Sequence, residues 1–310
     1  MGRGLGFGKV ILFNEHFVVY GIPAIVSAIG AKTTALVEQT PGSGYELKDE
    51  RPETPGYKTE KFDQQKESLD IILKFMKIDT QHTHYTITLA GDLIAASGVG
   101  ASAASCAAIA RAFSDELNLN LSDQRVNEIA YEGEKGYHGT PSGIDNTAAT
   151  YGGLIWYRRD GSKQLMERMR LRKPVEIVMG NTGKVADTKS VVAGVRERKE
   201  KEPEKYGRLL QDADHLVKNA RKRLEDFNLE EVGACMDENH KLLQEIGVSS
   251  PELDALVKLA RDNGAIGAKL TGTGKGGYMV ALTPGRELQN RVADEIDKHG
   301  SQALRTLIGV

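Results

Sequence analysis

Residues 92–111 read DLIAASGVGASAASCAAIAR and join a glycine-rich turn to a helix built largely of Ala, Ser and Cys. Glycines just ahead of a helix let the backbone approach a ligand closely, because no Cβ stands in the way. The unpaired N–H groups and the positive dipole end of the helix favour an anion at the same place. A di- or triphosphate would fit there, although a tight turn before a small-residue helix in a core explains the same residues.

The composition is that of an ordinary globular protein, with 40% hydrophobic and 27% charged residues. A length of 310 residues favours two domains over a single core. The formal net charge of −2 argues against a nucleic-acid partner, since such proteins carry a strongly basic surface. No apolar run approaches the ~20 residues of a membrane span, and the N-terminus lacks the apolar core of a secretory signal. The two cysteines read as free thiols, which indicates a reducing compartment, so we expect a cytoplasmic enzyme. Because no apolar run is long enough to span a membrane, we expect no membrane partner.

The first part of the chain reads as a mixture of strands and helices. Short β-branched runs predict strands at 9–13 and 17–20, with the polar residues 14–16 between them. Residues 40–60 are rich in Pro, Gly and charge, which is typical of a surface hairpin or flexible loop. Further strands are predicted at 24–29, 33–38, 84–89 and 154–157. Helices are predicted at 65–77, at 123–135 and within 138–153, and Ser122 is the predicted N-cap of the helix at 123–135.

The second part begins after a polar connector at 158–173, and we place the domain boundary between residues 172 and 173. The two predicted domains are therefore 1–172 and 173–310. The charge run RERKEKEPEK at 196–205 is most simply a solvated face. Strands are predicted at 175–179, 265–270, 278–282 and 302–309, and helices at 203–226, 228–246, 251–262 and 285–298.

Five motifs carry a family resemblance. In chain order they read GKVILFNEHFVVYG (8–21), SGVGASAA (97–104), GEKGYHGTPSGIDN (133–146), NTGKVADTKSVVAGVR (181–196) and KLTGTGKGG (269–277). They resemble the motifs of the GHMP kinases, and together they are similar to those of the mevalonate kinases over nearly the whole chain. The resemblance implies an α+β fold of two GHMP kinase domains, ribosomal-protein-like at the N-terminus and ferredoxin-like at the C-terminus, with the active site in the cleft between them.

The same resemblance implies ATP- and Mg²⁺-dependent phosphorylation of the 5-hydroxyl of mevalonate, which gives 5-phosphomevalonate in isoprenoid biosynthesis. Such a reaction depends on alignment and on neutralising phosphate charge. By the motif match, Asp145 is the catalytic carboxylate and Lys9 lies beside it. Ser102 and Glu134 match the residues that bind Mg²⁺. The residues matched to the ATP phosphates are Ser97, Gly98, Val99, Gly100, Ala101, Ser102 and Ala103, and those matched to mevalonate are Glu15, His16 (as a donor), Asp145 and Thr188.

Plainer explanations exist for these residues taken one at a time. A carboxylate near a helix end, such as Glu134, is usually solvated, and so is a lysine at a strand start, such as Lys9. Asp145 would favour the helix dipole in the first turn of any helix. The TGTGKGG run could be only a structural turn between two strands. The assignments therefore depend on the motifs in combination.

Some positions depart from the family pattern. Ala101 replaces the usual first serine of the phosphate loop, Asn14 replaces a glycine, and Thr273 and Lys275 replace Ala and Gly. These departures weaken the assigned nucleotide contacts more than the assigned reaction. The alternatives are another GHMP kinase, acting on phosphomevalonate, a sugar or an amino-acid alcohol, or a non-catalytic ligand sensor of the same fold. A homodimer is compatible with the sequence, which gives neither the oligomeric state nor feedback inhibition by isoprenoid diphosphates.

Overall fold

The computed structural model describes residues 1–96, 98–161, 163–184 and 188–310, apart from the side chains of Asp160, Thr188 and Lys189. The chain divides into two units. Unit 1 comprises Met1–Lys9 with Ala28–Gly152, and unit 2 comprises Val10–Ser27 with Gly153–Val310. Strands β1 (Gly2–Phe13) and β2 (Ala24–Thr40) contribute residues to both units. The domain boundary that the sequence places between residues 172 and 173 stays a prediction.

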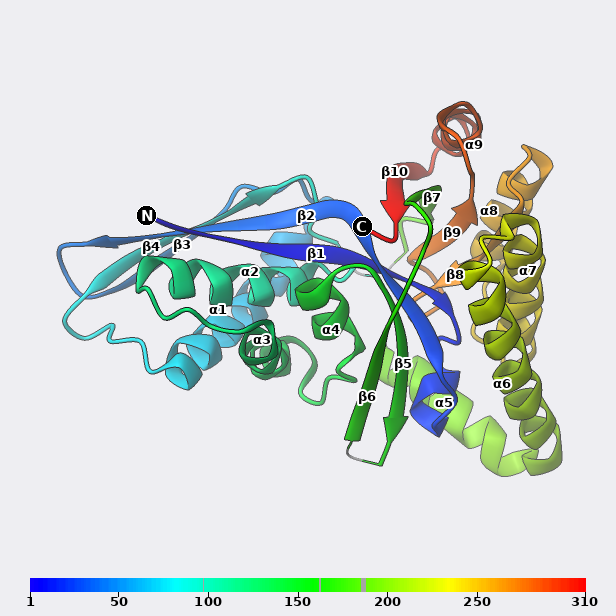
Figure 1. The fold of residues 1–310 in the computed structure, drawn as a ribbon, viewed down its shortest axis with the longest axis horizontal. Coiled ribbons are helices and arrows are strands. Elements are labelled where there is room, and N and C mark those ends of the chain that lie inside the picture. The colour runs from blue at the N-terminus through cyan, green and yellow to red at the C-terminus, as the bar shows by residue number, and fades with distance from the viewer. Residues whose placement is uncertain (97, 162, 185–187) are drawn as a thin grey trace. The chain divides into compact units, whose positions relative to one another are not determined.

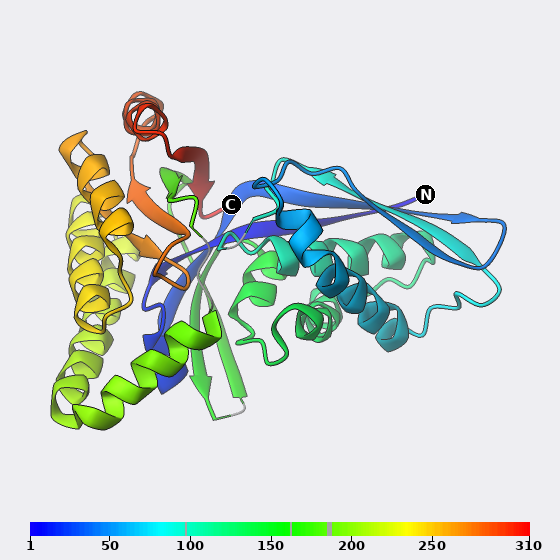
Figure 2. The same cartoon turned by 180° about the vertical axis from the view of Figure 1, so that it is seen from behind.

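The sheet of unit 1 is built around β2. Residues 33–40 of β2 pair antiparallel with β4 (His84–Gly91), and the other edge of β4 pairs in parallel with β3 (Gly44–Asp49). β1 also pairs with β2. Four helices lie along one face of this sheet and pack against their neighbours (Figures 1 and 2); they are α1 (Tyr57–Met76), α2 (Ala101–Glu116), α3 (Asp123–His138) and α4 (Ile144–Tyr151).

Three glycines explain how α2 comes close to β1. Gly2, Gly4 and Gly6 are buried on one face of the strand, and a Cβ added to them would lie 2.3, 2.1 and 2.0 Å from carbonyl oxygens of α2. The oxygens belong, in the same order, to Ala112, Ala108 and Ala104. A larger residue would push the helix off the strand, because the packed interior has no room for it. The contact therefore fixes α2 directly on the strand that continues to Lys9.

Unit 2 contains an antiparallel sheet in the order β10–β7–β9–β8. Its strands are β7 (Val175–Asn181), β8 (Gly267–Thr271), β9 (Tyr278–Leu282) and β10 (Gln302–Ile308). Its helices are α5 (Thr188–Lys201), α6 (Pro203–Glu225), α7 (Leu229–Glu245), α8 (Pro251–Asp262) and α9 (Arg286–Lys298). α7 and α8 contact β8, and α9 contacts β7 and β10, so buried Leu, Val, Ile and Ala side chains form one core with the sheet.

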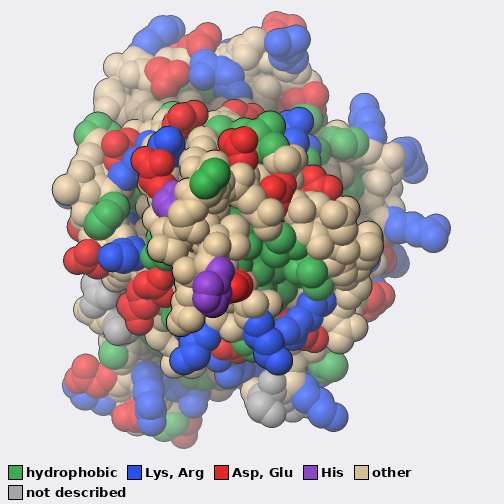
Figure 3. Space-filling model, turned by 90° about the vertical axis from the view of Figure 1, so that its left-hand side faces the viewer, with side chains coloured by type: hydrophobic (Ala, Val, Ile, Leu, Met, Phe, Trp, Pro, Cys, Tyr) green, Lys and Arg blue, Asp and Glu red, His purple; other side chains and the backbone are tan. Residues whose placement is uncertain are grey.

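Most helices and strands agree with the sequence-based expectations, and the α+β class is confirmed. Ser122 caps α3 as predicted, since its Oγ accepts a hydrogen bond from the N–H of Arg125 at 3.2 Å. Among the described residues, none of the helices combines the length and the apolar character that a bilayer-spanning helix requires. On the face shown in Figure 3, Lys and Arg side chains are interspersed with Asp and Glu.

Two predictions for the first part of the chain are wrong. Residues 17–20 form a 3₁₀ helix instead of a strand, because Asn14 and His16 take positive φ angles of 70° and 63° that turn the backbone. Residues 40–60 are neither a hairpin nor a flexible loop. They contain β3 and the start of α1. β3 pairs in parallel with β4, and a local pattern does not reveal this pairing.

The predicted polar connector at 158–173 is also wrong. These residues complete a hairpin of β5 (Leu154–Asp160) and β6 (Lys163–Met169), and β5 pairs on its other edge with residues 24–27 of β2. Most side chains of β6 are exposed, so the strand has the polar composition of a loop.

Candidate active site

The glycine-rich turn at the start of α2 packs against the side chain of Lys9. Gly98 and Gly100 take positive φ angles of 95° and 72°, and a Cβ on Gly100 would lie 2.6 Å from Cγ of Lys9. The N–H of Lys9 donates to the carbonyl of Val99 at 2.9 Å. Residues 101–103 then form the first turn of α2, whose N–H groups have no partner within the helix. The turn therefore has the features of an anion cradle.

Asp145, in the first turn of α4, lies beside Lys9. Its Oδ1 is 3.3 Å from Nζ of Lys9, and 28% of the Asp145 side chain is exposed against 4% of Lys9. Gly143, with a φ of 87°, lets the chain turn into α4 just ahead of the aspartate. Lys9 is thus not the solvated lysine of the plainer explanation. The pair places a buried cation next to a carboxylate that a ligand can reach.

Glu134 lies on the buried face of α3, with 1% of its side chain exposed. The Ser102 hydroxyl donates a hydrogen bond to its carboxylate, while Oε1 has no hydrogen-bond partner among the residues that the structure describes. Burial raises the pKa of Glu134 to about 8, and the negative charge of Asp145 adds to the effect. A buried carboxylate with an unpaired oxygen beside a hydroxyl fits Mg²⁺, which takes one or two carboxylates and otherwise binds phosphate oxygens and water.

The raised pKa of Glu134 predicts a pH-dependent stability. Because this pKa is about 8 in the folded state and 4.5 ordinarily, the folded protein holds the proton more tightly than the unfolded chain. The free energy of unfolding should therefore fall as the pH rises from 4.5 to about 8, by up to roughly 5 kcal/mol. Chemical unfolding of the metal-free protein across this range measures the slope.

Two variants on α3 make that measurement specific. Glu134→Gln should flatten the slope, because the amide does not ionise. Glu128→Gln is the matched control, since Glu128 is 45% exposed in an ion pair with Arg125, and it should keep the wild-type slope. Equal slopes for wild type and Glu134→Gln would contradict the prediction.

Asn14 anchors the turn between β1 and the 3₁₀ helix inside unit 2. Its side-chain amide donates to the carbonyls of Pro23 at 2.8 Å and Ala213 at 3.0 Å. Its backbone N–H donates to Oδ1 of Asn239, and Asn239 Nδ2 donates back to Asn14 Oδ1, both at 3.2 Å. Asparagine also tolerates the positive φ of this position better than most residues. The departure from the family glycine therefore keeps the turn and adds side-chain anchors to it.

The next two residues of the turn are held by β8 and by the loop after it. Glu15 forms a buried ion pair with Lys269, and the two side chains are 1% and 0% exposed. The Nε2–H of His16 donates to the carbonyl of Thr273 at 2.7 Å. Burial lowers the pKa of His16, so the ring is neutral near pH 7 and offers Nδ1 as an acceptor instead of the expected donor.

The structure thus brings Lys9, Asp145, Ser102 and Glu134 together in unit 1 and fixes Glu15 and His16 in unit 2. Ser97, the first residue matched to the phosphates, lies outside the described residues. Of Thr188, only its place at the start of α5 is described. Within the described residues, no group of three or more His, Cys, Asp or Glu is arranged to hold a metal ion. The candidate metal ligands that the motif match names are Ser102 and Glu134.

Comparisons with known proteins agree with this arrangement. Residues 67–153 match the GHMP kinases N terminal domain, and residues 217–302 match the GHMP kinases C terminal domain. A mevalonate kinase of Pyrococcus horikoshii is 34% identical over 307 residues, which cover 93% of this chain and 90% of the relative. The chain belongs to the mevalonate kinase family of GHMP kinases.

Two further relatives extend the comparison within the mevalonate kinase family. The Pyrococcus abyssi mevalonate kinase is 34% identical over 319 residues, covering 97% of this chain and 93% of the relative. The crystal structure of L. major mevalonate kinase in complex with R-mevalonate is 40% identical and superposes with a TM-score of 0.97, over 99% of this chain and 96% of that chain. This chain therefore resembles mevalonate kinases along its length.

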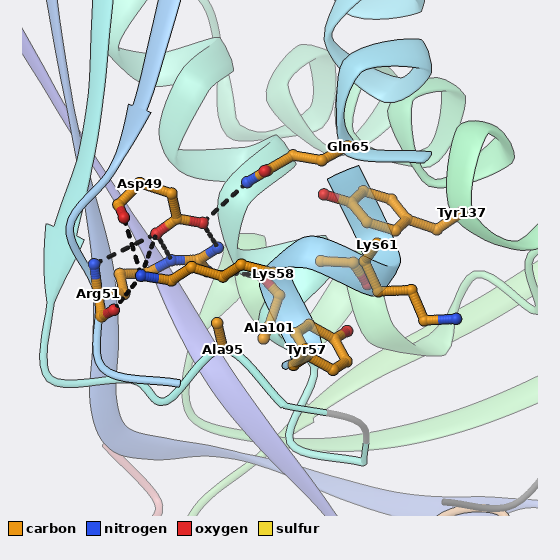
Figure 4. A pocket seen from close by; sticks show the side chains of 10 residues that line it. Asp49, Arg51, Tyr57, Lys58, Lys61, Gln65, Ala95, Ala101 and Tyr137 are labelled. Carbon is orange, nitrogen blue, oxygen red and sulfur yellow. Dashed lines mark hydrogen bonds and ion pairs between the residues drawn. The ribbon is translucent and has the colours of Figure 1, made fainter. Parts of the chain in front are cut away.

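A pocket lies beside Ser102 in this mevalonate kinase family member (Figure 4). Most of the residues that line it are not part of the five motifs. The lining residues are Asp49, Arg51, Tyr57, Lys58, Lys61, Gln65, Ala95, Ala101, Ser102 and Tyr137. The sequence-based interpretation placed Asp49, Arg51, Tyr57 and Lys58 in a surface hairpin or flexible loop, because charged residues between Pro and Gly are typical of one. It assigned no role to Lys61, Gln65 or Ala95. The available signal was the alternation of Tyr45 and Leu47 with polar residues, which predicts a strand ending near Asp49.

Proposed function

We propose that this chain transfers the γ-phosphoryl group of ATP to the 5-hydroxyl of mevalonate, giving 5-phosphomevalonate in isoprenoid biosynthesis. The observation that carries the proposal is the Lys9–Asp145 pair, which lies directly beside the turn at the start of α2. Membership of the mevalonate kinase family supports the choice of acceptor, and the L. major relative is a complex with R-mevalonate. The cytoplasmic location and the homodimer remain predictions from the sequence.

Asp145 acts on the substrate hydroxyl in this proposal. Its carboxylate accepts the proton of the 5-hydroxyl as the oxygen attacks the γ-phosphorus, or holds that hydroxyl in line. The ammonium of Lys9, 3.3 Å away, is a fixed positive charge next to the transferring group. Such a preorganised cation stabilises the negative charge of the transition state without reorganising during the reaction. The two residues therefore combine proton acceptance with charge stabilisation.

We assign residues 97–103 to the ATP phosphates and Ser102 with Glu134 to the metal. Backbone N–H groups at the start of α2 bind phosphate oxygens, as helix N-termini do in general. When bound, Mg²⁺ would neutralise phosphate charge and help to orient the γ-phosphoryl group. The fit rests on the buried Oε1 of Glu134 and on the hard oxygen donors of both side chains.

We assign Glu15, His16 and Thr188 to mevalonate by their motifs. The ion pair with Lys269 keeps Glu15 in one orientation, and the bond to Thr273 keeps the His16 ring in one tautomer. A neutral His16 with Nδ1 as an acceptor suits a hydroxyl donor of the substrate better than its carboxylate. Rigid support of this kind is what precise positioning of a small substrate requires.

The proposed function is tested by ADP release with R-mevalonate and Mg-ATP. We expect turnover that depends on mevalonate, with 5-phosphomevalonate as the product identified by mass. Phosphomevalonate, galactose and homoserine serve as competing acceptors in the same assay. If ADP release with mevalonate does not exceed the rate without acceptor, the proposed activity is ruled out. A higher kcat/KM for another acceptor would reassign the substrate.

A further inference from the structure

Both ends of the turn that leads into α2 are tied to one segment, residues 51–54. At the entry to the turn, the N–H of Ala95 donates to the carbonyl of Pro52 at 2.7 Å, and the N–H of Thr54 donates to the carbonyl of Ala95 at 3.1 Å. At its exit, Nη1 of Arg51 donates to the carbonyl of Ala101 at 3.2 Å. One short segment thus spans the whole turn.

Arg51 is the buried centre of this arrangement, with 4% of the residue exposed. Its Nε and Nη2 donate to the two carboxylate oxygens of Asp49 at 2.9 and 2.6 Å (Figure 4). Its Nη1 bonds Thr33 Oγ1 at 3.2 Å in addition to the carbonyl of Ala101. The planar guanidinium therefore has one fixed orientation, with its fork on the carboxylate and its remaining nitrogen on the first residue of α2.

Helix α1 holds Asp49 and Arg51 in place from the other side. Gln65 Nε2 donates to Asp49 Oδ2 at 2.9 Å, and Lys58 Nζ donates to the carbonyls of Asp49 at 2.8 Å and Arg51 at 2.5 Å. Burial alone would raise the pKa of Asp49, yet its bonds to Arg51 hold that pKa below the ordinary value. The carboxylate is therefore ionised at neutral pH and keeps the arginine fork engaged.

We propose that Arg51 is a positioning residue for the nucleotide: oriented by Asp49, it holds the first turn of α2, and with it Ser102, in the place where the phosphates of ATP bind. The inference rests on the proposed function. The charge of Arg51 is balanced by Asp49, so its contribution is the fixed hydrogen bond from Nη1 to the carbonyl of Ala101 in the first turn of α2. Residues outside the recognised motifs would thus set the affinity for ATP.

Arg51→Met and Asp49→Asn test the proposal by separating the two substrates. Both variants should raise KM for ATP and the dissociation constant of a non-hydrolysable ATP analogue with Mg²⁺, measured by calorimetry. The expected increase is roughly 10- to 100-fold for Arg51→Met, the range for a lost hydrogen bond to a charged group. KM for mevalonate should stay near the wild-type value, because the side-chain partners of Arg51 are Asp49, Thr33 and Ala101, none of which is assigned to mevalonate.

Ile87→Ala is the control for a merely structural role. Ile87 is fully buried in the middle of β4, opposite Val37 and Leu47, so its truncation destabilises unit 1 without touching either end of the turn. It should lower the melting temperature and leave analogue binding unchanged. If Ile87→Ala weakened analogue binding as much as Arg51→Met, the role of Arg51 would be structural only.

The binding measurement keeps this inference separate from the proposed function. Wild-type ADP release with mevalonate tests the function, whereas calorimetry with the analogue needs no acceptor. Wild-type affinity for the analogue in folded Arg51→Met would overturn the inference even if mevalonate is phosphorylated. If Arg51→Met does not fold, Arg51→Lys replaces it. A lysine has no fork to bridge Asp49 and Ala101, so an unchanged dissociation constant would again overturn the inference.

Discussion

Asp145→Asn is expected to lower kcat for mevalonate phosphorylation by roughly 10²- to 10⁴-fold, the usual contribution of a positioned general base. The asparagine has nearly the size of the aspartate and stays next to Lys9, so the loss isolates the ability to accept a proton. KM for ATP should change little, because Asp145 lies in α4 and not in the turn at the start of α2. Steady-state ADP release at saturating substrates measures the effect.

A second first-turn aspartate provides the matched control for Asp145. Asp123 occupies the first turn of α3, is 54% exposed and pairs with Arg111 at 2.6 Å. If Asp145 served only the helix dipole, Asp123→Asn and Asp145→Asn would both cost a few tenths to about 1 kcal/mol of stability and little activity. We expect Asp123→Asn to keep wild-type kcat. Near-wild-type turnover in Asp145→Asn would remove Asp145 from the catalytic role.

Lys269→Met is expected to have the largest effect on stability, lowering the free energy of unfolding by roughly 3–5 kcal/mol. The side chain of Lys269 is fully buried, and it donates both to Glu15 and to the carbonyl of Leu270 at 2.6 Å. Removing the ammonium leaves Glu15 as a buried charge without its cation, which costs more than the pair itself contributes. Urea unfolding monitored by circular dichroism gives the change.

Two further variants identify the cause of that loss. The double variant Glu15→Gln with Lys269→Met has no buried carboxylate that has lost its ammonium partner, so part of the lost stability should return. Lys218→Met removes a pair that is exposed, with 59% of Lys218 accessible and Asp214 at 2.5 Å, and should cost less than about 1 kcal/mol. A Lys269→Met variant as stable as Lys218→Met would show that Glu15 is not a buried charge.

Local patterns predicted the parts of the fold that short-range chemistry determines. Ser122 was identified as a cap because its bond to Arg125 spans only three residues, and β4 was identified from its own alternation. The turn at Asn14 could not be predicted in this way. Its backbone N–H is held by the side chain of Asn239, 225 residues away, so the run after it looked like a strand. Segments whose conformation depends on distant partners escape a local interpretation.

The candidate site divides in a similar way. The motifs named Lys9 and Asp145, and their contact at 3.3 Å is consistent with the paired roles that the family implies. The spacing of Glu134 after Ala130 puts it beside the buried stripe of α3. Its nearly complete burial could not be predicted, because it results from packing of α3 against neighbouring helices, as where Gly133 approaches Ile72 and Cys106. Arg51 was missed altogether, since its partners Asp49, Thr33 and Ala101 come together only in the folded sheet and helix.

Buried positions in a strand usually carry large apolar side chains, but the buried face of β1 that packs against α2 carries glycines. Gly2, Gly4 and Gly6 are buried, while Arg3 and Leu5 between them are exposed. Tolerance to substitution along this strand should alternate with a period of two, and the intolerant positions are the ones with no side chain. The three positions would then be required to lack a side chain. A hydrophobicity profile gives them no sign of burial, although α2 packs directly against them.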